Sequence, residues 1–384
     1  MAQLVAPNFD RLNKLSQSAD ADLVERPLVP QKRNRGRGAQ TNVSGRFERQ
    51  KRETFDDGWD IEEEDALQPF ETHERLEKAV SVIARNDSPD IGFDRSINPY
   101  RGCEHGCSYC YARQTHAYLG LSAGLDFERE IFIKTNAADL LRKELSAPRY
   151  KVKPIAIGTN TDPYQPVERQ HKIMRQILEV LLETKHPVTI TTKSALIVRD
   201  LDILTEMAGH GLVSATIAVT SLDHKLSRLM EPRAATPARR LEAMRLLAAA
   251  GVPVSVNFAP AIPAINDHEL ERVLDAAKAQ GATGAAMALL RLPGEVRDVF
   301  REWMFRHYPD RLRHVMSLVR DTRGGRDNDP RFGSRMRGEG PYAVMLRQRF
   351  DKAIERYGLS SRPQRLRTDL FRGPKQDDPQ LTLF

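Results

Sequence analysis

The chain contains three cysteines among its 384 residues, and they stand close together as Cys103, Cys107 and Cys110 in the spacing C-x-x-x-C-x-x-C. Cysteine thiolates are the usual protein ligands of iron-sulfur clusters. Three thiolates on one short loop can surround a cubic [4Fe-4S] cluster and leave its fourth iron without a protein ligand. The spacing therefore predicts an iron-sulfur site whose open iron can bind a second molecule.

A zinc site is the alternative interpretation, with His105 as a fourth ligand beside the three thiolates. Structural zinc sites more often combine a short cysteine pair with a distant second pair of ligands, and the chain has no second cysteine pair. Clustered cysteines also argue against a disulfide framework and indicate a reducing compartment. The iron-sulfur interpretation is favoured.

Downstream of about residue 95, short β-branched apolar runs alternate with helical patterns, which is typical of repeated β/α units around a parallel sheet. Loops at the carboxyl ends of such strands carry the functional groups, and the cysteine motif follows the first run. We expect strands at 96–100, 154–159, 188–192, 214–221, 252–259 and 285–291, helices at 167–182, 237–250 and 267–279, and a further strand and helix within 130–145.

The segment RGCEHGCSYCYAR, residues 101–113, resembles the cluster loop of radical S-adenosylmethionine (SAM) enzymes. Over about residues 93–300 the chain is similar to the spore photolyase-like, or DNA repair photolyase, subgroup of that superfamily. The similarity is carried by GTNTDPYQPVE at 158–168, MEPRAATPARR at 230–240 and NFAPAIPAIND at 257–267, together with Tyr109, Tyr111 and Ser221. It implies an α/β fold with a partial (β/α)6 TIM-like barrel, and a [4Fe-4S] cluster and SAM as cofactors.

The resemblance also implies which residues surround SAM. Asn160, Thr161 and Asp162 follow the second strand, where similar proteins hold the SAM amino group. Lys193 follows the third strand and Ser221 ends the fourth. At these two places similar proteins contact the carboxylate and the ribose of SAM. Asp162 alternatively caps the next helix, and Lys193 is alternatively a solvated lysine at a strand end.

One departure from the subgroup concerns hydrogen-atom transfer. Spore photolyase uses an additional cysteine after its second strand as the hydrogen-atom donor, whereas this chain has Thr159 near that place and no fourth cysteine. Tyr109 and Tyr111 are candidates for relaying a hydrogen atom, and both alternatively pack beside the cluster. The resemblance also implies that Tyr109, directly before the last cysteine, contacts the cofactor. Glu231 and Arg240 are further site candidates that alternatively form an ion pair on helix ends.

Outside the barrel, residues 32–52 carry eight basic side chains and residues 53–65 carry eight acidic ones. This pattern predicts a disordered charged tail, with a nucleic-acid-binding arm as the alternative. We expect the tail at 1–75, the barrel at 76–300, a helical extension with an arginine- and glycine-rich loop at 301–357, and a C-terminal tail at 358–384.

The extreme carboxyl terminus ends in QLTLF, with Gln380, Leu381, Leu383 and Phe384. This pentapeptide resembles the short motif by which bacterial replication and repair proteins dock on the DNA sliding clamp. A glutamine can bond at the rim of a pocket while the apolar side chains fill it. The alternative is that these side chains fold back on the barrel as a small hydrophobic cluster.

The resemblance implies an enzyme that reductively cleaves SAM to a 5'-deoxyadenosyl radical and acts on nucleic acid, in the manner of DNA repair. The net charge of +7 and the arginines of the loop at 321–341 suit an anionic partner. The alternatives are radical modification of RNA or protein, or a non-catalytic iron-sulfur module. We further expect an electron donor such as flavodoxin or ferredoxin, a cytoplasmic location and no membrane segment.

Overall fold

The computed structural model describes residues 34, 36–47 and 70–374. Its centre is a seven-stranded sheet in the order β10-β9-β8-β7-β6-β3-β2. Every neighbouring pair from β3 to β10 is parallel, and β2 is antiparallel to β3. The strands are β2 (Ile83–Arg85), β3 (Arg95–Ile97), β6 (Ile155–Ile157), β7 (Val188–Thr192), β8 (Val213–Ala218), β9 (Val254–Ala261) and β10 (Gly284–Leu289).

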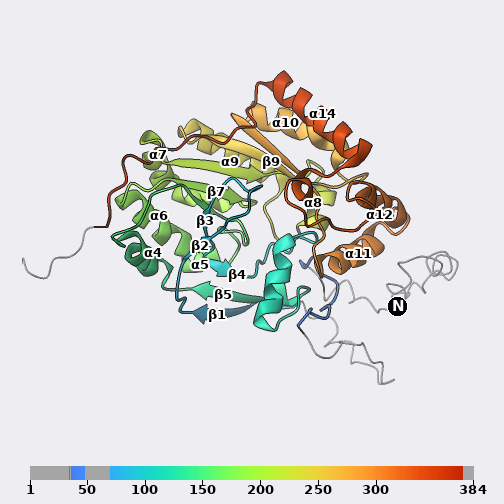
Figure 1. Cartoon of the computed structure of the whole chain (residues 1–384), viewed down its shortest axis with the longest axis horizontal. Coiled ribbons are helices and arrows are strands. Elements are labelled where there is room, and N and C mark those ends of the chain that lie inside the picture. The colour runs from blue at the N-terminus through green and yellow to red at the C-terminus, as the bar shows by residue number, and fades with distance from the viewer. Residues whose placement is uncertain (1–33, 35, 48–69, 375–384) are drawn as a thin grey trace, which may run out of the picture.

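Helices follow these strands and cover the outer face of the sheet (Figure 1). They are α4 (Ala137–Leu145), α5 (Glu168–His171), α6 (Ile173–Glu183), α7 (Leu201–Gly209), α8 (His224–Met230), α9 (Pro237–Ala249) and α10 (Leu270–Ala279), with 3-10 helices η3 (Ala195–Asp200) and η4 (Asp267–Glu269). A further 3-10 helix, η2 (Tyr111–Leu119), follows the cysteines and lies outside this layer. The six parallel strands and their helices confirm the expected partial (β/α)6 barrel.

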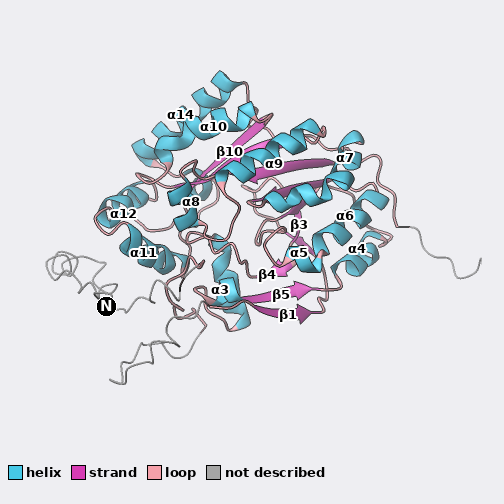
Figure 2. Ribbon diagram, turned by 180° about the vertical axis from the view of Figure 1, so that it is seen from behind, coloured by secondary structure: helices cyan, strands magenta, loops and turns pink. Residues whose placement is uncertain are grey.

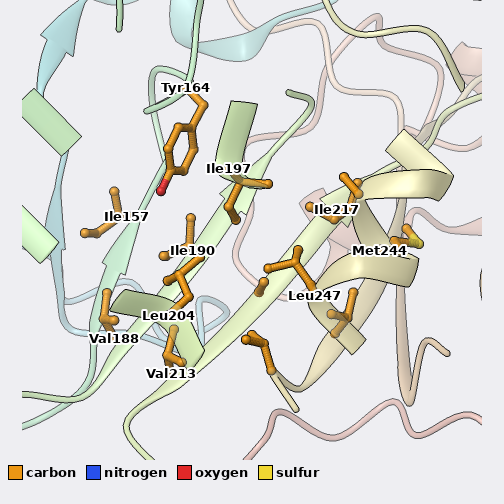
Figure 3. Close-up of a cluster of buried hydrophobic side chains, with 14 of the residues drawn as sticks. Ile157, Tyr164, Val188, Ile190, Ile197, Leu204, Val213, Ile217, Met244 and Leu247 are labelled. Atoms are coloured by element: carbon orange, nitrogen blue, oxygen red, sulfur yellow. The ribbon is translucent and has the colours of Figure 1, made fainter. Parts of the chain in front are cut away.

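The apolar pattern of the strands explains which face packs on the helices. In β7, Val188, Ile190 and Thr192 are buried, whereas Thr189 and Thr191 between them are only half-buried. Successive strand residues point to opposite faces, so the aliphatic set meets the helices, and Thr189 and Thr191 line the inner face. Figure 3 shows Val188 and Ile190 within one apolar cluster with side chains of the helical layer, among them Leu204.

A second, three-stranded sheet lies beside the barrel, in the order β1-β5-β4. Its strands are β1 (His73–Glu77), β4 (Tyr100–Arg101) and β5 (Glu130–Lys134). The single strand predicted at 96–100 is therefore two strands in different sheets, because the chain turns away at Asn98 and Pro99 to pair with β5. The helix predicted at 167–182 is also interrupted, since Lys172 has a φ of 51°.

The carboxyl-terminal extension contains α11 (Val296–His307), α12 (Leu312–Asp321), α13 (Ser334–Arg337) and α14 (Gly340–Tyr357). Figure 2, like Figure 1, places α11 and α12 at the opposite end of the molecule from α4. Phe300 and Trp303 of α11 share an apolar cluster with Cys107 and Tyr109. The extension is thus packed against the cysteine loop.

The prediction of a disordered tail over 1–75 is wrong for residues 36–47, which we call the N-terminal strap. Arg37 donates to the Glu128 carbonyl oxygen at 2.6 Å, and the Gly38 amide donates to the Glu128 carboxylate at 2.9 Å, on the short helix α3 (Asp126–Arg129). Arg46 forms an ion pair of 2.8 Å with Glu295. Arg37 and Arg46, the two basic side chains of the run that the structure describes, are therefore bonded within the fold.

Residues 358–374 cross the amino ends of the strands. Ser360 pairs with Gly284 at the start of β10, and the Arg367 amide donates to the Gly211 carbonyl at 2.9 Å, just before β8. The clamp-like motif of Gln380, Leu381, Leu383 and Phe384 lies outside the described residues, as do 1–33 and 48–69. Among the helices of the described part, none is long and apolar enough to cross a membrane.

Candidate functional site

The cysteine loop connects β4 to η2, beyond the carboxyl end of β3. Cys103 and Cys107 are buried and Cys110 is half-buried, and all three are free thiols. Burial raises the pKa of each thiol, because the charged thiolate loses its hydration. Iron ions supply the positive charge that binds a thiolate in such surroundings. This donor set suits a metal cluster.

Glycines and buried polar side chains fix the backbone of the cysteine loop. Gly102 and Gly106 have φ values of 80° and 66°, and a Cβ at Gly106 would lie 2.7 Å from a Glu128 carboxylate oxygen. The Gln165 side-chain amide accepts from the Glu104 amide at 2.8 Å and donates to the Gly102 carbonyl at 3.1 Å. The loop conformation therefore has support from residues far along the chain.

The loop fits an iron-sulfur cluster better than zinc. Over residues 70–374 and the strap, no three His, Cys, Asp or Glu side chains converge as a single metal ion requires. His105, the fourth ligand of the zinc alternative, places its Nδ1 3.3 Å from Asp162 Oδ2. The Ser108 hydroxyl is buried and has no hydrogen-bond partner in the described part of the chain. It can therefore donate a hydrogen bond to a sulfide of a bound cluster. A [4Fe-4S] cluster needs three separated thiolates, one for each of three irons.

Glu231 is a buried carboxylate at the centre of a network beside the cysteine loop. It accepts hydrogen bonds from the Tyr109 hydroxyl, from Thr220 Oγ1 at 2.8 Å and from Arg240, and Lys193 Nζ lies 3.4 Å away. Burial by itself raises its pKa, but Arg240 and Lys193 outweigh burial and lower the pKa to about 2. The ion pair of Glu231 with Arg240 is confirmed, and it lies in the interior rather than on exposed helix ends.

Asp162 is held entirely by protein groups. One oxygen accepts from the Tyr164 amide at 2.9 Å and the Thr192 hydroxyl at 2.6 Å, and the other accepts from the Lys193 amide at 2.7 Å and faces His105. These bonds tie the loop after β6 to the end of β7. The alternative that Asp162 caps the next helix is wrong, because α5 begins at Glu168 with Val167 at its N-cap position.

The other expected SAM contacts differ in exposure. Asn160 is exposed and Lys193 is half-buried, both at the carboxyl ends of their strands. Thr161 is buried, and its hydroxyl donates to the Tyr100 carbonyl at 3.0 Å. Ser221 is also buried, and its hydroxyl donates to Glu269 at 2.5 Å. Of these four, Asn160 and Lys193 present polar groups at the barrel rim.

The two tyrosines of the motif have different surroundings. Tyr109 is buried, and burial, together with the negative charge of Glu231, raises its pKa well above the ordinary value. Tyr111 is 44% exposed, and its hydroxyl donates to the backbone carbonyl of Thr159. The Tyr111 hydroxyl therefore reaches the loop that follows β6.

Two supporting residues were missed by the sequence analysis. Gln165 holds the cysteine loop, and Glu168 accepts from the Tyr100 hydroxyl and from Arg199 at 2.6 Å. Both belong to the block GTNTDPYQPVE, so the signal was present in the sequence. The block GTNTDPYQPVE therefore contains residues that hold the cysteine loop, such as Gln165, as well as residues at the barrel rim, such as Asn160.

Comparison with known proteins agrees with this geometry. The family model of the radical SAM superfamily matches residues 97–277. An uncharacterized protein of Mycobacterium tuberculosis is 35% identical over 277 residues, covering 70% of this chain and 76% of the relative. An uncharacterized protein of Methanocaldococcus jannaschii is 27% identical over 174 residues, covering 45% of this chain and 62% of that protein.

Among solved structures, spore photoproduct lyase complexed with dinucleoside spore photoproduct has a TM-score of 0.55 at 16% identity, covering 75% of this chain and 81% of that one. At this identity the likeness concerns the fold. The family match, the mycobacterial relative and the cysteine loop at the barrel mouth together settle the family. The chain belongs to the radical SAM superfamily, whose members use a [4Fe-4S] cluster and SAM, and these are its cofactors.

Proposed function

We propose that the protein reductively cleaves SAM and uses the radical chemistry on nucleic acid, as in DNA repair. The observation that carries the proposal is the position of the cysteine loop at the mouth of six parallel strands, with polar side chains from several strands at the rim. When bound, the cluster supplies one electron to SAM, and SAM cleavage yields a 5'-deoxyadenosyl radical. The chain's own residues hold these groups and shield them from water.

Each residue has a role in this proposal. Cys103, Cys107 and Cys110 hold the cluster. The ammonium of Lys193 binds the SAM carboxylate, because a charge-assisted bond at a half-buried site is strong. Asn160 meets the SAM amino group through its side-chain oxygen.

The remaining three predicted SAM residues act through others in this proposal. Asp162 is a positioning residue, since its oxygens are occupied by the protein. Thr161 and Ser221 likewise orient the loops that meet the cofactor, because their hydroxyls are bonded to other protein groups.

Tyr111 is the better placed of the two candidate hydrogen-atom relays. It is half exposed at the mouth, whereas the Tyr109 hydroxyl is buried against Glu231. A relay must meet the substrate, so we assign this role to Tyr111 and a packing and positioning role to Tyr109.

Nucleic acid is the proposed substrate because of the fold likeness and the excess of basic residues. The solved structure with this likeness is that of a lyase in complex with a dinucleoside photoproduct. A net charge of +7 favours a polyanionic partner. The electron donor in the proposal is flavodoxin or ferredoxin, in the cytoplasm, where thiols stay reduced.

An anaerobic assay tests this proposal. Reconstituted protein is reduced in the presence of SAM, and 5'-deoxyadenosine is measured by mass spectrometry with DNA, RNA or protein fractions added. We expect DNA to stimulate its formation. Stimulation by RNA or protein alone would assign the enzyme to those substrates instead, and failure to cleave SAM under any condition would support a non-catalytic iron-sulfur module.

A further inference from the structure

Arg291 lies at the barrel mouth, just beyond the end of β10. Its guanidinium carbon is 5.9 Å from the centre of the Tyr111 ring. Its Nη1 contacts the thioether sulfur of Met336 at 3.1 Å, and its Nε is buried without a hydrogen-bond partner. Within the described residues, no carboxylate or carbonyl oxygen accepts from this side chain.

The charged groups around Arg291 are already engaged elsewhere. Asp90 is paired with Arg335, through two hydrogen bonds of 2.5 and 2.7 Å. Arg323 is fully buried and directs its hydrogen bonds to backbone carbonyl oxygens, at 2.6 to 3.3 Å. Burial and the nearby Arg335 both lower the pKa of Arg291. Asp329, the other carboxylate near these arginines, is paired with Arg331. Arg291 is thus left without a carboxylate partner among the described residues.

A groove begins at the residue after Arg291. It has a volume of about 630 Å³, and its lining includes Leu292, Gly294, Arg326 and Asn328. Arg326 is exposed, and within the described part of the chain its side chain takes part in no hydrogen bond or ion pair. The lining also contains Arg46 paired with Glu295, Arg297 paired with Asp298, and Asp327, which pairs with Arg320. Arg326 is therefore the arginine of the described lining that has no carboxylate partner.

We propose that Arg291 anchors an oxyanion subsite that binds one backbone phosphate of the nucleic-acid substrate, with Arg326 contacting the adjoining backbone in the groove. A partly buried guanidinium without a counter-charge is unfavourable, and a bound anion offsets that cost. The planar fork of arginine matches a phosphate with two parallel hydrogen bonds.

The position of the subsite separates it from the proposed SAM carboxylate contact. Lys193 follows β7, and in the sheet β8 and β9 lie between β7 and β10. The ring of Tyr111, beside Arg291, provides a face on which a base can stack. A phosphate at Arg291 would thus place the adjoining nucleotide next to the proposed hydrogen-atom relay. The subsite rests on the proposed function, because it takes the nucleic acid to be the substrate.

Binding measurements on the reconstituted holoenzyme with SAM test the subsite. The probe is a fluorescent single-stranded DNA of about twelve nucleotides, within the usual site size of single-strand binders. For Arg291→Gln we expect at least about tenfold weaker DNA binding. The slope of the logarithm of the binding constant against the logarithm of the salt concentration should fall in magnitude by about 0.7. Arg291→Lys should keep the slope but lose part of the affinity. SAM affinity should be unchanged in both.

Two further variants complete the design. Arg326→Gln changes an exposed side chain, so it tests the groove without destabilising the fold. We expect it to reduce the salt dependence of DNA binding by a similar amount. Arg245→Gln is the matched control, because it removes the same charge from the exposed outer surface of α9. It should leave DNA binding unchanged.

Three results would overturn the subsite. DNA affinity and salt slope equal to wild type in Arg291→Gln and Arg326→Gln would show that neither arginine meets a phosphate. Weaker SAM binding with unchanged DNA binding in Arg291→Gln would identify the oxyanion as the SAM carboxylate. Wild-type protein that binds neither DNA nor RNA would overturn both the subsite and the proposed substrate, whereas the first two results leave the proposed function standing.

Discussion

Changing Glu231 to Gln tests whether the buried network beside the cysteine loop is a charged one. The substitution keeps the size of the side chain and its capacity to accept from Tyr109 and Thr220. It removes the negative charge that faces Arg240 and Lys193. Arg240 would then remain buried without a counter-charge, which strongly destabilises a fold.

The size of the effect follows from the pKa of Glu231. The fall from the ordinary value of 4.5 to about 2 corresponds to about 3 kcal/mol, at about 1.4 kcal/mol for each pH unit. Breaking a buried ion pair by removing one partner costs about 3 to 5 kcal/mol, which agrees. We therefore expect Glu231→Gln to lower the free energy of unfolding by about 3 kcal/mol at neutral pH.

Anaerobic urea unfolding followed by circular dichroism measures this loss. The control is Glu271→Gln, which breaks a partly exposed pair with Arg349, at 2.7 Å, and should cost less than about 1 kcal/mol. Adding Arg240→Met to Glu231→Gln should restore part of the stability, because it removes the uncompensated cation. A loss in Glu231→Gln no larger than that of the control would refute a charged, buried network.

The same network predicts a pH dependence with a definite sign. The folded pKa of Glu231 lies below its ordinary value, so its contribution is fully present above pH 4.5 and is lost as the pH falls toward about 2. The stability difference between wild type and Glu231→Gln should therefore shrink over that acidic range. A difference that stays constant from neutral pH down to pH 3 would contradict the lowered pKa.

Four other outcomes are expected. Cys107→Ala should lose the iron and the visible absorption of the cluster, and retained iron and colour would contradict the ligand assignment. Lys193→Ala should weaken SAM binding by about tenfold or more in calorimetry while the cluster spectrum persists, and equal affinity would move the carboxylate contact elsewhere. Tyr111→Phe should still form 5'-deoxyadenosine but lose product turnover, and normal turnover would exclude the relay. A peptide of residues 375–384 should bind the sliding clamp with about micromolar affinity, and no detectable binding would end that hypothesis.

The barrel strands could be predicted because their pattern is local. β7 lies at 188–192 as expected, where Val188 and Ile190 of the outer face alternate with Thr189 and Thr191. The second sheet could not be predicted in the same way, because β1 and β5 are brought together from segments more than fifty residues apart. The break at Lys172 had no local signal, since neither glycine nor proline marks it.

The sequence predicts which residues lie at the barrel rim, but it does not predict whether each side chain faces a ligand or is bonded to other protein groups. Position at the carboxyl end of a strand correctly brings Asp162, Lys193 and Ser221 to the mouth of the barrel. Whether a side chain faces a ligand depends on which protein groups satisfy it, and Glu269, which accepts from Ser221, is 48 residues away. The orientation of Asp162 similarly depends on His105 and on the end of β7.

The N-terminal strap was missed because its bonds are polar and not periodic. Its basic residues form a charge run in the sequence, and their acceptors, such as Glu128 and Glu295, lie about 90 and 250 residues further along the chain. Charge composition alone indicated a solvated tail. The structure shows Arg37 bonded to backbone carbonyl oxygens and Arg46 paired with the Glu295 carboxylate, and neither contact has a local signal in the sequence.

Three buried side chains support the cysteine loop from three distant parts of the chain. Glu128 binds the Gly38 amide of the strap and Arg113 of η2, Gln165 holds the loop backbone, and Glu231 holds Tyr109. These bonds are formed by protein groups and restrict the loop in addition to the three thiolates. Each bond that restricts the loop reduces the conformational entropy that cluster binding would otherwise cost.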